Sequence, residues 1–371
     1  MISSSGYWLT AVGVLYFFEK IFVLNIAPFL TAIYVLGIII YNFTRINRFT
    51  YERKKHNKLV IITISIVAVV MGGYTYLSRD IWLTQPYINA TPYIYEGGSK
   101  ISYDEVTGIY TITKQEGDYR ILQLTDIHLG GGVLSYDKDL KALKAVYELL
   151  CDTKPDLVIV TGDLVFPVGW SSFSFNNTAP VQQFAAFMRN TGIPWAFTYG
   201  NHDTESYAAT SSNDLNTLYK SLSYKTSRTL LYPYIQPNIT GRNNQLIELK
   251  NADGTFNQLL FLMDSNAYTG EGLNKYDYIH DDQVEWYRRE ILRIEEEAGY
   301  IVPSMVFFHM PLQEYRTAYE LYEHQGIRLT YGMSIDYLAM PGIARDTNQR
   351  GGTLITIHDD GSTDIKQVPL N

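Results

Sequence analysis

The 371-residue sequence contains a single cysteine, Cys151, and only 18% of its residues are charged. One cysteine excludes an intramolecular disulfide framework and every zinc site built from several cysteines. Any metal site must therefore use His, Asp, Glu or Asn side chains. Because 46% of the residues are hydrophobic, the chain is too apolar to be a disordered protein.

The sequence also lacks the excess of positive charge that nucleic-acid binding requires. Its formal net charge is −8 at pH 7, whereas proteins that hold nucleic acid neutralise phosphates with Lys and Arg. We therefore expect no nucleic-acid partner. A nuclease would need a local basic patch, so this function has little support from the sequence.

Two runs near the start of the chain lack charged side chains altogether, residues 21–41 and 59–77. Each is long enough to cross the hydrocarbon core of a bilayer as a helix. The loop between them carries six Lys and Arg against one Glu, which favours a cytoplasmic position. A third apolar run, residues 7–18, fits either an interfacial segment or part of a third crossing. The sequence predicts a membrane anchor over residues 1–78, with the rest of the chain on the extracytoplasmic side.

The remainder predicts a connector with a leading hairpin over residues 79–117 and a layered α/β domain over residues 118–371. Short apolar runs alternate with amphipathic stretches, which favours strands alternating with helices around one core. The predicted strands are 120–124, 157–160, 195–198, 259–263 and 305–308, and the predicted helices include 179–189 and 281–297. Residues 352–357 and 365–368 predict a closing hairpin around Asp360-Gly361.

Polar clusters follow four of the predicted strands. They are Asp126 with His128 after RILQLT, Gly162-Asp163 after LVIVT, Gly200-Asn201-His202-Asp203 after WAFTY, and His309 after MVFF. Strand ends are where α/β sheets bind ligands. A single Asp there is more often a turn or helix cap, and a single His a hydrogen-bonded core group. The ordered set of oxygen and nitrogen donors instead predicts a metal site suited to Mn, Fe or Zn and poor for Ca.

The order D-x-H, G-D, G-N-H-D and H resembles that of the calcineurin-like metallophosphoesterases, from about residue 118 to the C-terminus. The segments LQLTDIHLG, VTGDL, YGNHD, FFHMPLQEY and GIRLTYG are similar to one branch of that family. This branch contains yeast and plant phosphatases similar to purple acid phosphatases, and bacterial membrane-anchored relatives. The resemblance implies a four-layer αββα sandwich with a dinuclear metal centre between its sheets.

The same resemblance implies a role for each residue of the clusters. One metal would be held by Asp126, His128 and Asp163, and the second by Asp163, Asn201 and His309. His202 would stand beside the phosphate as acid or electrostatic stabiliser, with Asp203 orienting it. Two divalent or trivalent cations (Mn, Fe or Zn) about 3.5 to 4 Å apart polarise a phosphoryl group and activate water for in-line attack.

The chain departs from the family pattern after His309. Relatives carry a Gly-His-x-His element that gives one imidazole to each metal, whereas here only residues 310–325 separate His309 from the GIRLTYG segment. The flanks on both sides keep the family pattern, so this stretch resembles an internal deletion. His324 is the one histidine within it, either as a replacement ligand or as a surface residue. Without the element each metal retains at most three protein ligands.

Two functions follow from this pattern. The first is a membrane-anchored, metal-dependent phosphoesterase that hydrolyses a phosphomonoester or phosphodiester outside the cytoplasm, with a phosphorylated small molecule or lipid as substrate. The second is a catalytically weak or inactive pseudoenzyme that serves as a binding or regulatory module. The loops 171–180 and 205–213 are expected to shape the pocket, but their Ser, Asn and Thr residues suit several substrate classes.

Overall fold

The computed structural model describes residues 86–132, 134–167, 174–226, 229–269, 276–312, 327–339 and 349–370, the helical residues 61–70, and positions 37, 72, 172, 323 and 324. The chain divides into two compact units, Met1–Thr84 and Gln85–Asn371. The predicted run 7–18, the run 21–41 except position 37, and residues 59–60, 71 and 73–77 of the run 59–77 lie outside the described residues. Within the described part of the chain, no helix has both the length and the apolar character needed to span a bilayer.

The larger unit contains a six-stranded sheet that carries most of the predicted motifs. Its strand order is β13 (Thr363–Pro369), β12 (Gly351–Ile357), β3 (Tyr119–Leu124), β4 (Leu157–Thr161), β5 (Trp195–Thr198) and β6 (Leu230–Leu231). The strands β3 to β6 run parallel, while β12 is antiparallel to both β3 and β13. The predicted closing hairpin is confirmed as β12 and β13.

A five-stranded sheet of mixed direction accompanies it. Its order is β1 (Lys100–Tyr103), β2 (Tyr110–Thr113), β7 (Gln245–Lys250), β8 (Phe256–Leu262) and β9 (Ser304–Phe307). The sequence pattern placed the leading hairpin in the connector 79–117, but β2 pairs in parallel with β7, so the hairpin belongs to this sheet. A short ladder of β10 (Glu323–His324) and β11 (Ile327–Arg328) stands apart from both sheets.

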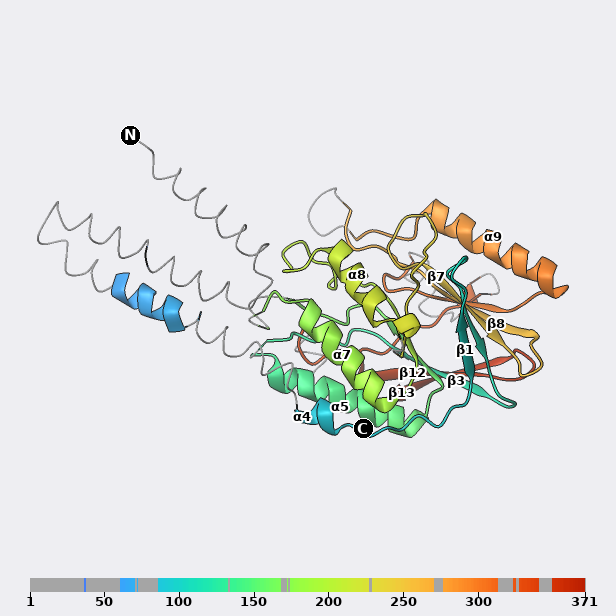
Figure 1. Cartoon of the computed structure of the whole chain (residues 1–371), viewed down its shortest axis with the longest axis horizontal. Helices are drawn as coiled ribbons and strands as arrows, with labels where there is room; N and C mark the ends of the chain where they lie inside the picture. The colour runs from blue at the N-terminus through green and yellow to red at the C-terminus, as the bar shows by residue number, and fades with distance from the viewer. Residues whose placement is uncertain are drawn as a thin grey trace, which may run out of the picture. The chain divides into compact units, whose positions relative to one another are not determined.

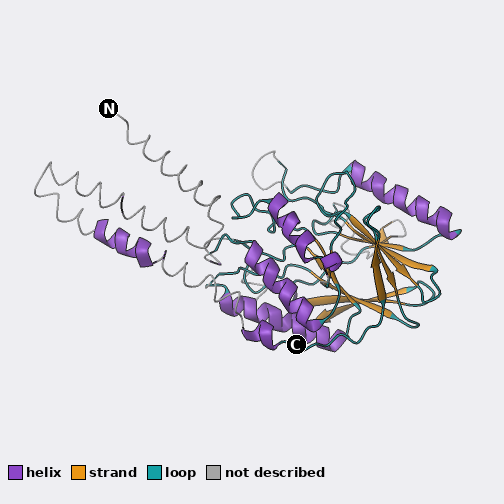
Figure 2. Ribbon diagram, in the orientation of Figure 1, coloured by secondary structure: helices purple, strands orange, loops and turns teal. Residues whose placement is uncertain are grey.

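Helices flank the two sheets on opposite sides of this unit (Figure 1, Figure 2). The helices α5 (Tyr136–Thr153), α7 (Thr178–Thr191) and α8 (Ser212–Leu222) lie on the side of the six-stranded sheet, and α9 (Asp281–Ala298) lies on the other side. The short helices α4 (Pro86–Ala90) and η1 (Tyr224–Thr226) complete the described elements of this unit.

Two buried clusters show how the layers are held together. One joins the inner faces of both sheets and includes Ile121 and Ile159 from the first and Leu260 from the second. The other lies between the five-stranded sheet and α9, where the rings of Phe261 and Trp286 meet edge to face with centroids 5.4 Å apart. Strand side chains alternate between faces, so each sheet packs on two neighbours. The unit is therefore a layered α/β structure of two mixed sheets between helices.

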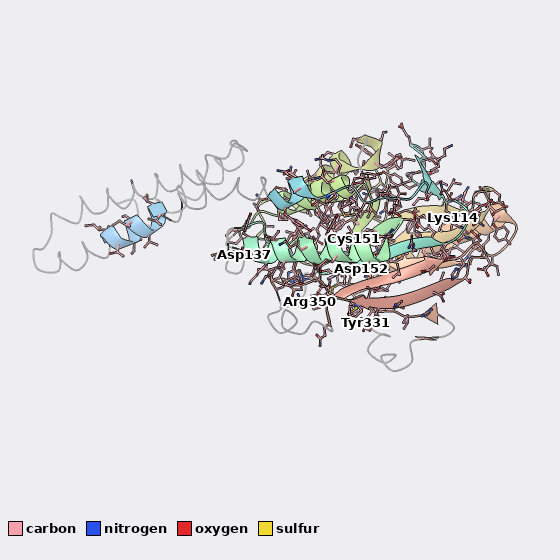
Figure 3. The ribbon with its side chains drawn as sticks, turned by 90° about the horizontal axis from the view of Figure 1, so that it is seen from below. Lys114, Asp137, Cys151, Asp152, Tyr331 and Arg350 are labelled. Atoms are coloured by element: carbon pink, nitrogen blue, oxygen red, sulfur yellow. The ribbon has the colours of Figure 1, made fainter. Side chains whose placement is uncertain are left out.

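The helix α5 illustrates how the sequence covers the outer face of a sheet. Leu143 and Leu150 lie two turns apart and are both buried, as expected for an amphipathic helix. Asp137 stands in the first turn, where a carboxylate interacts favourably with the helix dipole. Figure 3 shows Asp137 and Asp152 toward opposite ends of this helix. Cys151 is a free, exposed thiol on the same helix.

Candidate metal centre

The four polar clusters predicted from the sequence meet at one edge of the two sheets. The parallel strands β3, β4 and β5 are neighbours, so their carboxyl ends place the D-x-H, G-D and G-N-H-D segments side by side. The strand β9 of the other sheet ends at Phe307 and brings His309 to the same place, where its ring contacts Asp163. The site therefore depends on both sheets.

Backbone hydrogen bonds join the loops after β3 and β4. His128 N–H donates to the Asp163 carbonyl at 3.0 Å, and Asp126 N–H donates to the Gly162 carbonyl at 3.2 Å. Asp126, His128 and Asp163 all have positive φ angles, of 51°, 53° and 51°. Such backbone conformations cost about 1–3 kcal/mol each in non-glycine residues and gather at functional sites. Their recurrence at three predicted ligands marks this edge as functional.

Two glycines allow the loops after β4 and β5 to touch. A Cβ on Gly162, whose φ is +85°, would lie 2.6 Å from Gly200 Cα and 2.9 Å from His309 Cβ. A Cβ on Gly200 would collide with the side chain and the backbone nitrogen of Asp163. The glycines that precede Asp163 and Asn201 are thus required by close approach of the backbone.

Asp163 occupies the centre of the site. Its Oδ2 lies 3.2 Å from His128 Nε2 and 3.3 Å from His309 Nε2, and its Oδ1 accepts a hydrogen bond from His202 N–H at 2.8 Å. Burial alone would raise the pKa of this carboxyl, but the charges of His309 and His128 and their hydrogen bonds hold it well below its usual value. One carboxylate oxygen therefore faces both imidazoles at once.

The other contacts of these two imidazoles are with a backbone carbonyl and with the remaining predicted ligands. His309 Nδ1 donates to the Thr161 carbonyl at 2.9 Å, which leaves Nε2 3.2 Å from Asn201 Oδ1. His128 Nε2 also lies 3.8 Å from Asp126 Oδ1. The structure thus brings together all five predicted ligands, which are Asp126, His128, Asp163, Asn201 and His309.

The electrostatics of the site favour positive charge. Burial lowers the pKa of His128 and His309, but the neighbouring carboxylates, Asp163 above all, outweigh it and raise both values to about 10. Ligand atoms of Asp126, Asp163 and His309 lie within 4.8 Å of one another, as do those of His128, Asp163 and His202. The two clusters share Asp163 and offer the mixed oxygen and nitrogen donors that suit Mn, Fe or Zn. They group Asp126 with His309 and His128 with His202, however, which differs from the pairs that the resemblance implies.

Asp336 is a residue of the site that the sequence motifs did not reveal. Its Oδ1 lies 3.2 Å from His128 Nδ1, and its side chain is 1% exposed. The two atoms are close enough to form an ion pair, but they are not aligned as in a regular hydrogen bond. The backbone N–H groups of Leu338 and Ala339 donate to the same oxygen at 2.8 and 2.7 Å. A fixed carboxylate thus stands behind one predicted ligand, as is usual for metal-binding histidines.

The segment that carries Asp336 is held against the end of β3. Ile335 N–H donates to the Thr125 carbonyl at 3.2 Å, and Gly351 N–H donates to the Ser334 carbonyl at 3.0 Å. Ser334 forms single bridges with both Thr125 and Arg350, so it lies between the extensions of β3 and β12. The chain downstream of the shortened stretch therefore contributes to the site.

The predicted partner of His202 requires a correction. We expected Asp203 to orient this ring, but the buried Asp203 carboxylate instead accepts backbone hydrogen bonds from Asp163 and Gly200, both at 2.8 Å, and from Val165 at 3.0 Å. Burial, with the charge of Asp163, raises the pKa of Asp203 to about 7. Asp203 therefore braces the loops rather than the imidazole.

Glu205 makes the contact that was assigned to Asp203. Its Oε1 lies 2.8 Å from His202 Nδ1 and also accepts a hydrogen bond from the Tyr268 hydroxyl at 3.0 Å. The sequence could have indicated this contact, because Glu205 follows His202 by three residues and a tight turn brings residues three apart together.

The remaining histidines of the larger unit differ in how they are placed. His280 precedes α9, where its N–H donates to Gln283 Oε1 at 2.8 Å, and His358 contacts Asp118 and Asp364 beside the closing hairpin. Both therefore make structural contacts away from the predicted ligands. His324 lies in β10, and its side chain, like residues 313–322, is outside the described part.

Comparison with known proteins supports the class that this site defines. Residues 119–342 match the family model described as calcineurin-like phosphoesterase, and the chain belongs to that family. The chain is 24% identical over 229 residues to "Probable inactive purple acid phosphatase 28" of Arabidopsis thaliana, which covers 55% of this chain and 56% of that protein. It is 28% identical over 258 residues to "Phosphatase DCR2" of Saccharomyces cerevisiae, which covers 63% of this chain and 43% of that protein.

A shorter similarity extends to a bacterial protein. The chain is 30% identical over 105 residues to "Probable cyclic nucleotide phosphodiesterase" of Psychrobacter arcticus, which covers 26% of this chain and 35% of that protein. The chain thus spans little more than half, or less, of the length of each of these curated relatives. The recognition of the family from its motifs is confirmed.

Proposed function

We propose that the chain is a metal-dependent phosphoesterase that hydrolyses a phosphomonoester or phosphodiester at a dinuclear centre. The observation that carries this proposal is the position of Asp163 Oδ2, 3.2 Å from His128 Nε2 and 3.3 Å from His309 Nε2. A carboxylate that faces two imidazoles from different loops is placed to serve two cations. Family membership supports the same reaction class.

Each residue of the site has a role in this proposal. Asp126 and His128 complete the first metal position, and Asn201 and His309 the second. When bound, two Mn, Fe or Zn ions would supply Lewis acidity toward the phosphoryl group. His202 gives a proton to the leaving oxygen as a general acid, and Glu205 positions its ring by holding Nδ1 at 2.8 Å. The side chain of His202 is 27% exposed, so a substrate can reach it.

A catalytically weak or inactive pseudoenzyme is the second candidate. The observation that favours it is the shortened stretch 310–325, which lacks the Gly-His-x-His element of the family pattern. With three protein ligands or fewer, a cation exchanges faster and is positioned less well. The site would then bind a phosphorylated ligand without turning it over at a useful rate.

We further propose that residues 1–78 anchor the chain in a membrane and that the phosphoesterase domain faces away from the cytoplasm. The uncharged runs 21–41 and 59–77 and the basic loop between them support this topology. The substrate is then a phosphorylated small molecule or lipid outside the cytoplasm. Protease treatment of intact cells should remove the domain, and protection of the whole domain would contradict this arrangement.

The decisive test of function is a paired measurement on the full chain. Metal content is measured by elemental analysis after loading with Mn²⁺, and hydrolysis of a generic aryl phosphate is followed in the same sample. The Asp163→Asn variant serves as the control for contaminating phosphatase. Metal with turnover supports the enzyme, metal without turnover supports the pseudoenzyme, and the absence of both would overturn the metal site.

A second variant assigns the proton donor. His202→Ala should lower turnover and leave most of the bound metal in place, because the residue is assigned to the leaving group and not to a cation. His309→Ala is the matched histidine substitution, and it should lose metal. If both variants lose metal equally, His202 is a ligand.

A further inference from the structure

Two pairs of aromatic side chains lie near Glu205, the partner of His202, and we refer to Phe175, Tyr207, Tyr268 and Tyr276 as the aromatic rim. Their exposed fractions run from 39% for Tyr268 to 55% for Phe175. A single exposed aromatic residue is ordinary on a protein surface. Four in two ring pairs beside one catalytic site instead indicate a surface that contacts a ligand.

The first ring pair is tied directly to the metal site. The Tyr268 hydroxyl accepts a hydrogen bond from Asn201 Nδ2 at 2.9 Å and donates one to Glu205 Oε1 at 3.0 Å. Its ring stacks on that of Tyr276, with centroids 5.7 Å apart and planes 26° from parallel. Asn201, a predicted metal ligand, and Glu205, the partner of His202, therefore fix the position of the Tyr268–Tyr276 pair.

The second ring pair comes from the two loops that were expected to shape the pocket. Tyr207 follows Glu205 by two residues, and its ring meets that of Phe175 edge to face with centroids 6.2 Å apart. Ala209 N–H donates to the Phe175 carbonyl at 2.8 Å, which joins the loops 171–180 and 205–213. This pair is therefore held in place by the backbone.

Beneath the rim, Phe166 supplies an apolar wall to the site itself. Its ring lies edge to face against both His202 and His128, with centroids 4.7 and 5.0 Å apart. Phe166 is buried, with 9% of its surface exposed. The His202 imidazole therefore contacts the Phe166 ring, and its partner Glu205 contacts Tyr268 of the rim.

We propose that the aromatic rim binds a leaving group that bears a planar aromatic ring. The inference rests on the proposed function, because it takes His202 as the proton donor to the leaving oxygen. The body of the leaving group must then lie near His202, and Tyr268 stands beside this residue through its hydrogen bonds with Glu205 and Asn201. Stacked and edge-to-face contacts with tyrosine and phenylalanine favour flat aromatic rings over aliphatic groups of the same size.

Binding calorimetry with non-hydrolysable ligands tests the rim without requiring turnover. The full chain, loaded with Mn²⁺, is titrated with phenylphosphonate and with cyclohexylphosphonate, which have rings of equal carbon number of which only one is aromatic. We expect phenylphosphonate to bind about three- to tenfold more tightly. Metal content is measured in each sample, so that a change in loading is not mistaken for a change in selectivity.

Matched variants locate the selectivity. Phe175→Leu and Tyr207→Leu should bring the ratio of the two dissociation constants close to one, whereas Tyr207→Phe, which keeps the ring, should retain it. Tyr93→Leu is the control, because Tyr93 is 67% exposed and lies outside the rim. These substitutions are on the surface, and a thermal unfolding curve for each variant verifies that it is folded.

The outcomes separate this inference from the proposed function. Equal binding of both phosphonates by the unmodified chain would overturn the rim and leave the phosphoesterase in place, as would a ratio unchanged in both leucine variants. Failure of both phosphonates to bind the metal-loaded chain would overturn the rim and the proposed function together. Loss of selectivity in Tyr93→Leu would show that the preference arises elsewhere.

Discussion

The loops after β3, β4 and β5 and the segment after β9 build the two halves of the candidate site in different ways. In the first half, backbone hydrogen bonds join the loops, and the buried Asp203 carboxylate accepts three more from them. In the second half, His309 stands on one strand end, and Asp336 reaches His128 from a segment that crosses between β3 and β12.

This difference indicates where the site tolerates change. Three left-handed residues and two glycines in close contact define the first half, so its geometry is fixed by the backbone before any metal binds. The second half relies on single side chains, and it adjoins the stretch in which the Gly-His-x-His element is missing. We therefore expect changes in the first half to abolish the site and changes in the second to weaken or improve it.

Asp163→Asn should have the largest effect. This carboxylate faces both His128 and His309, and an amide cannot carry the charge that two neighbouring cations require. We expect Mn²⁺ affinity to fall by more than about 100-fold, beyond the range typical of a residue behind the ligands. Asn201→Ala, which removes a neutral donor from one position, is the comparison and should lose less metal. Equal metal content in Asp163→Asn and the unmodified chain would refute the bridging role.

Insertion of a Gly-His-x-His segment between Tyr322 and Gly326 should improve the second half. Two further imidazoles would complete the coordination of both cations, so metal occupancy and phosphatase turnover should rise together, by about tenfold or more. The control is an insertion of the same length with alanine at both histidine positions. If the control raises activity as much, the length of the stretch matters rather than its ligands.

Asp336→Asn tests the side chain that supports His128 from the second half. Replacing the carboxylate removes the negative charge 3.2 Å from Nδ1, and loss of such a partner typically lowers metal affinity by about 10- to 100-fold. Asp253→Asn, on the exposed turn between β7 and β8, is the matched control. Calorimetric metal titration measures both, and an unchanged affinity in Asp336→Asn would leave that residue with a structural role alone.

The sequence predicted the first half of the site well because its signals are local. Apolar runs shortly before Asp126, Asp163 and Asn201 predict the strands and show which residues follow them. Parallel pairing of β3, β4 and β5 then brings those residues together. The layered α/β fold could be predicted for the same reason.

The features that were missed depend on contacts between distant segments. Asp336 reaches His128 only because Ser334 inserts between the extensions of β3 and β12. The pairing of β2 with β7 likewise joins the leading hairpin to the domain, although sequence composition placed it in a connector. Asp203 adjoins His202 in sequence, yet the turn directs its carboxylate to the backbone and leaves the ring to Glu205.

Gly162→Ala should reduce stability by an intermediate amount. The positive φ of +85° costs about 1–2 kcal/mol for a residue with a Cβ, and the contacts with Gly200 and His309 add about 1–3 kcal/mol. Gly254→Ala isolates the first contribution, because Gly254 has a φ of +88° and no atom within 4 Å of the added Cβ. Urea unfolding should show Gly162→Ala to be the more destabilised, and equal losses would show that the loops separate at little cost.

The smallest effect is expected far from the site, at His358. Its Nδ1 lies 2.7 Å from Asp118 Oδ1 and its Nε2 3.2 Å from Asp364 Oδ2. Hydrogen bonds to Asp118 and then to Asp364 raise the pKa of this exposed imidazole above its ordinary value of 6.5. The folded state therefore holds the proton more tightly than the unfolded state does. The resulting stability is fully present below about pH 6.5 and is lost as the pH rises through the higher pKa of the folded chain.

Unfolding free energies measured by urea between pH 6 and pH 9 should decrease less in His358→Gln than in the unmodified chain, and the decrease that His128 and His309 contribute should remain in both proteins. Solvent and salt screen the pair, so the change should shrink further at high ionic strength. Asp336→Asn is the control, because a change at the candidate metal site should leave the contribution of His358 to the pH dependence unchanged. A pH dependence identical in His358→Gln and the unmodified chain would place the titrating group elsewhere.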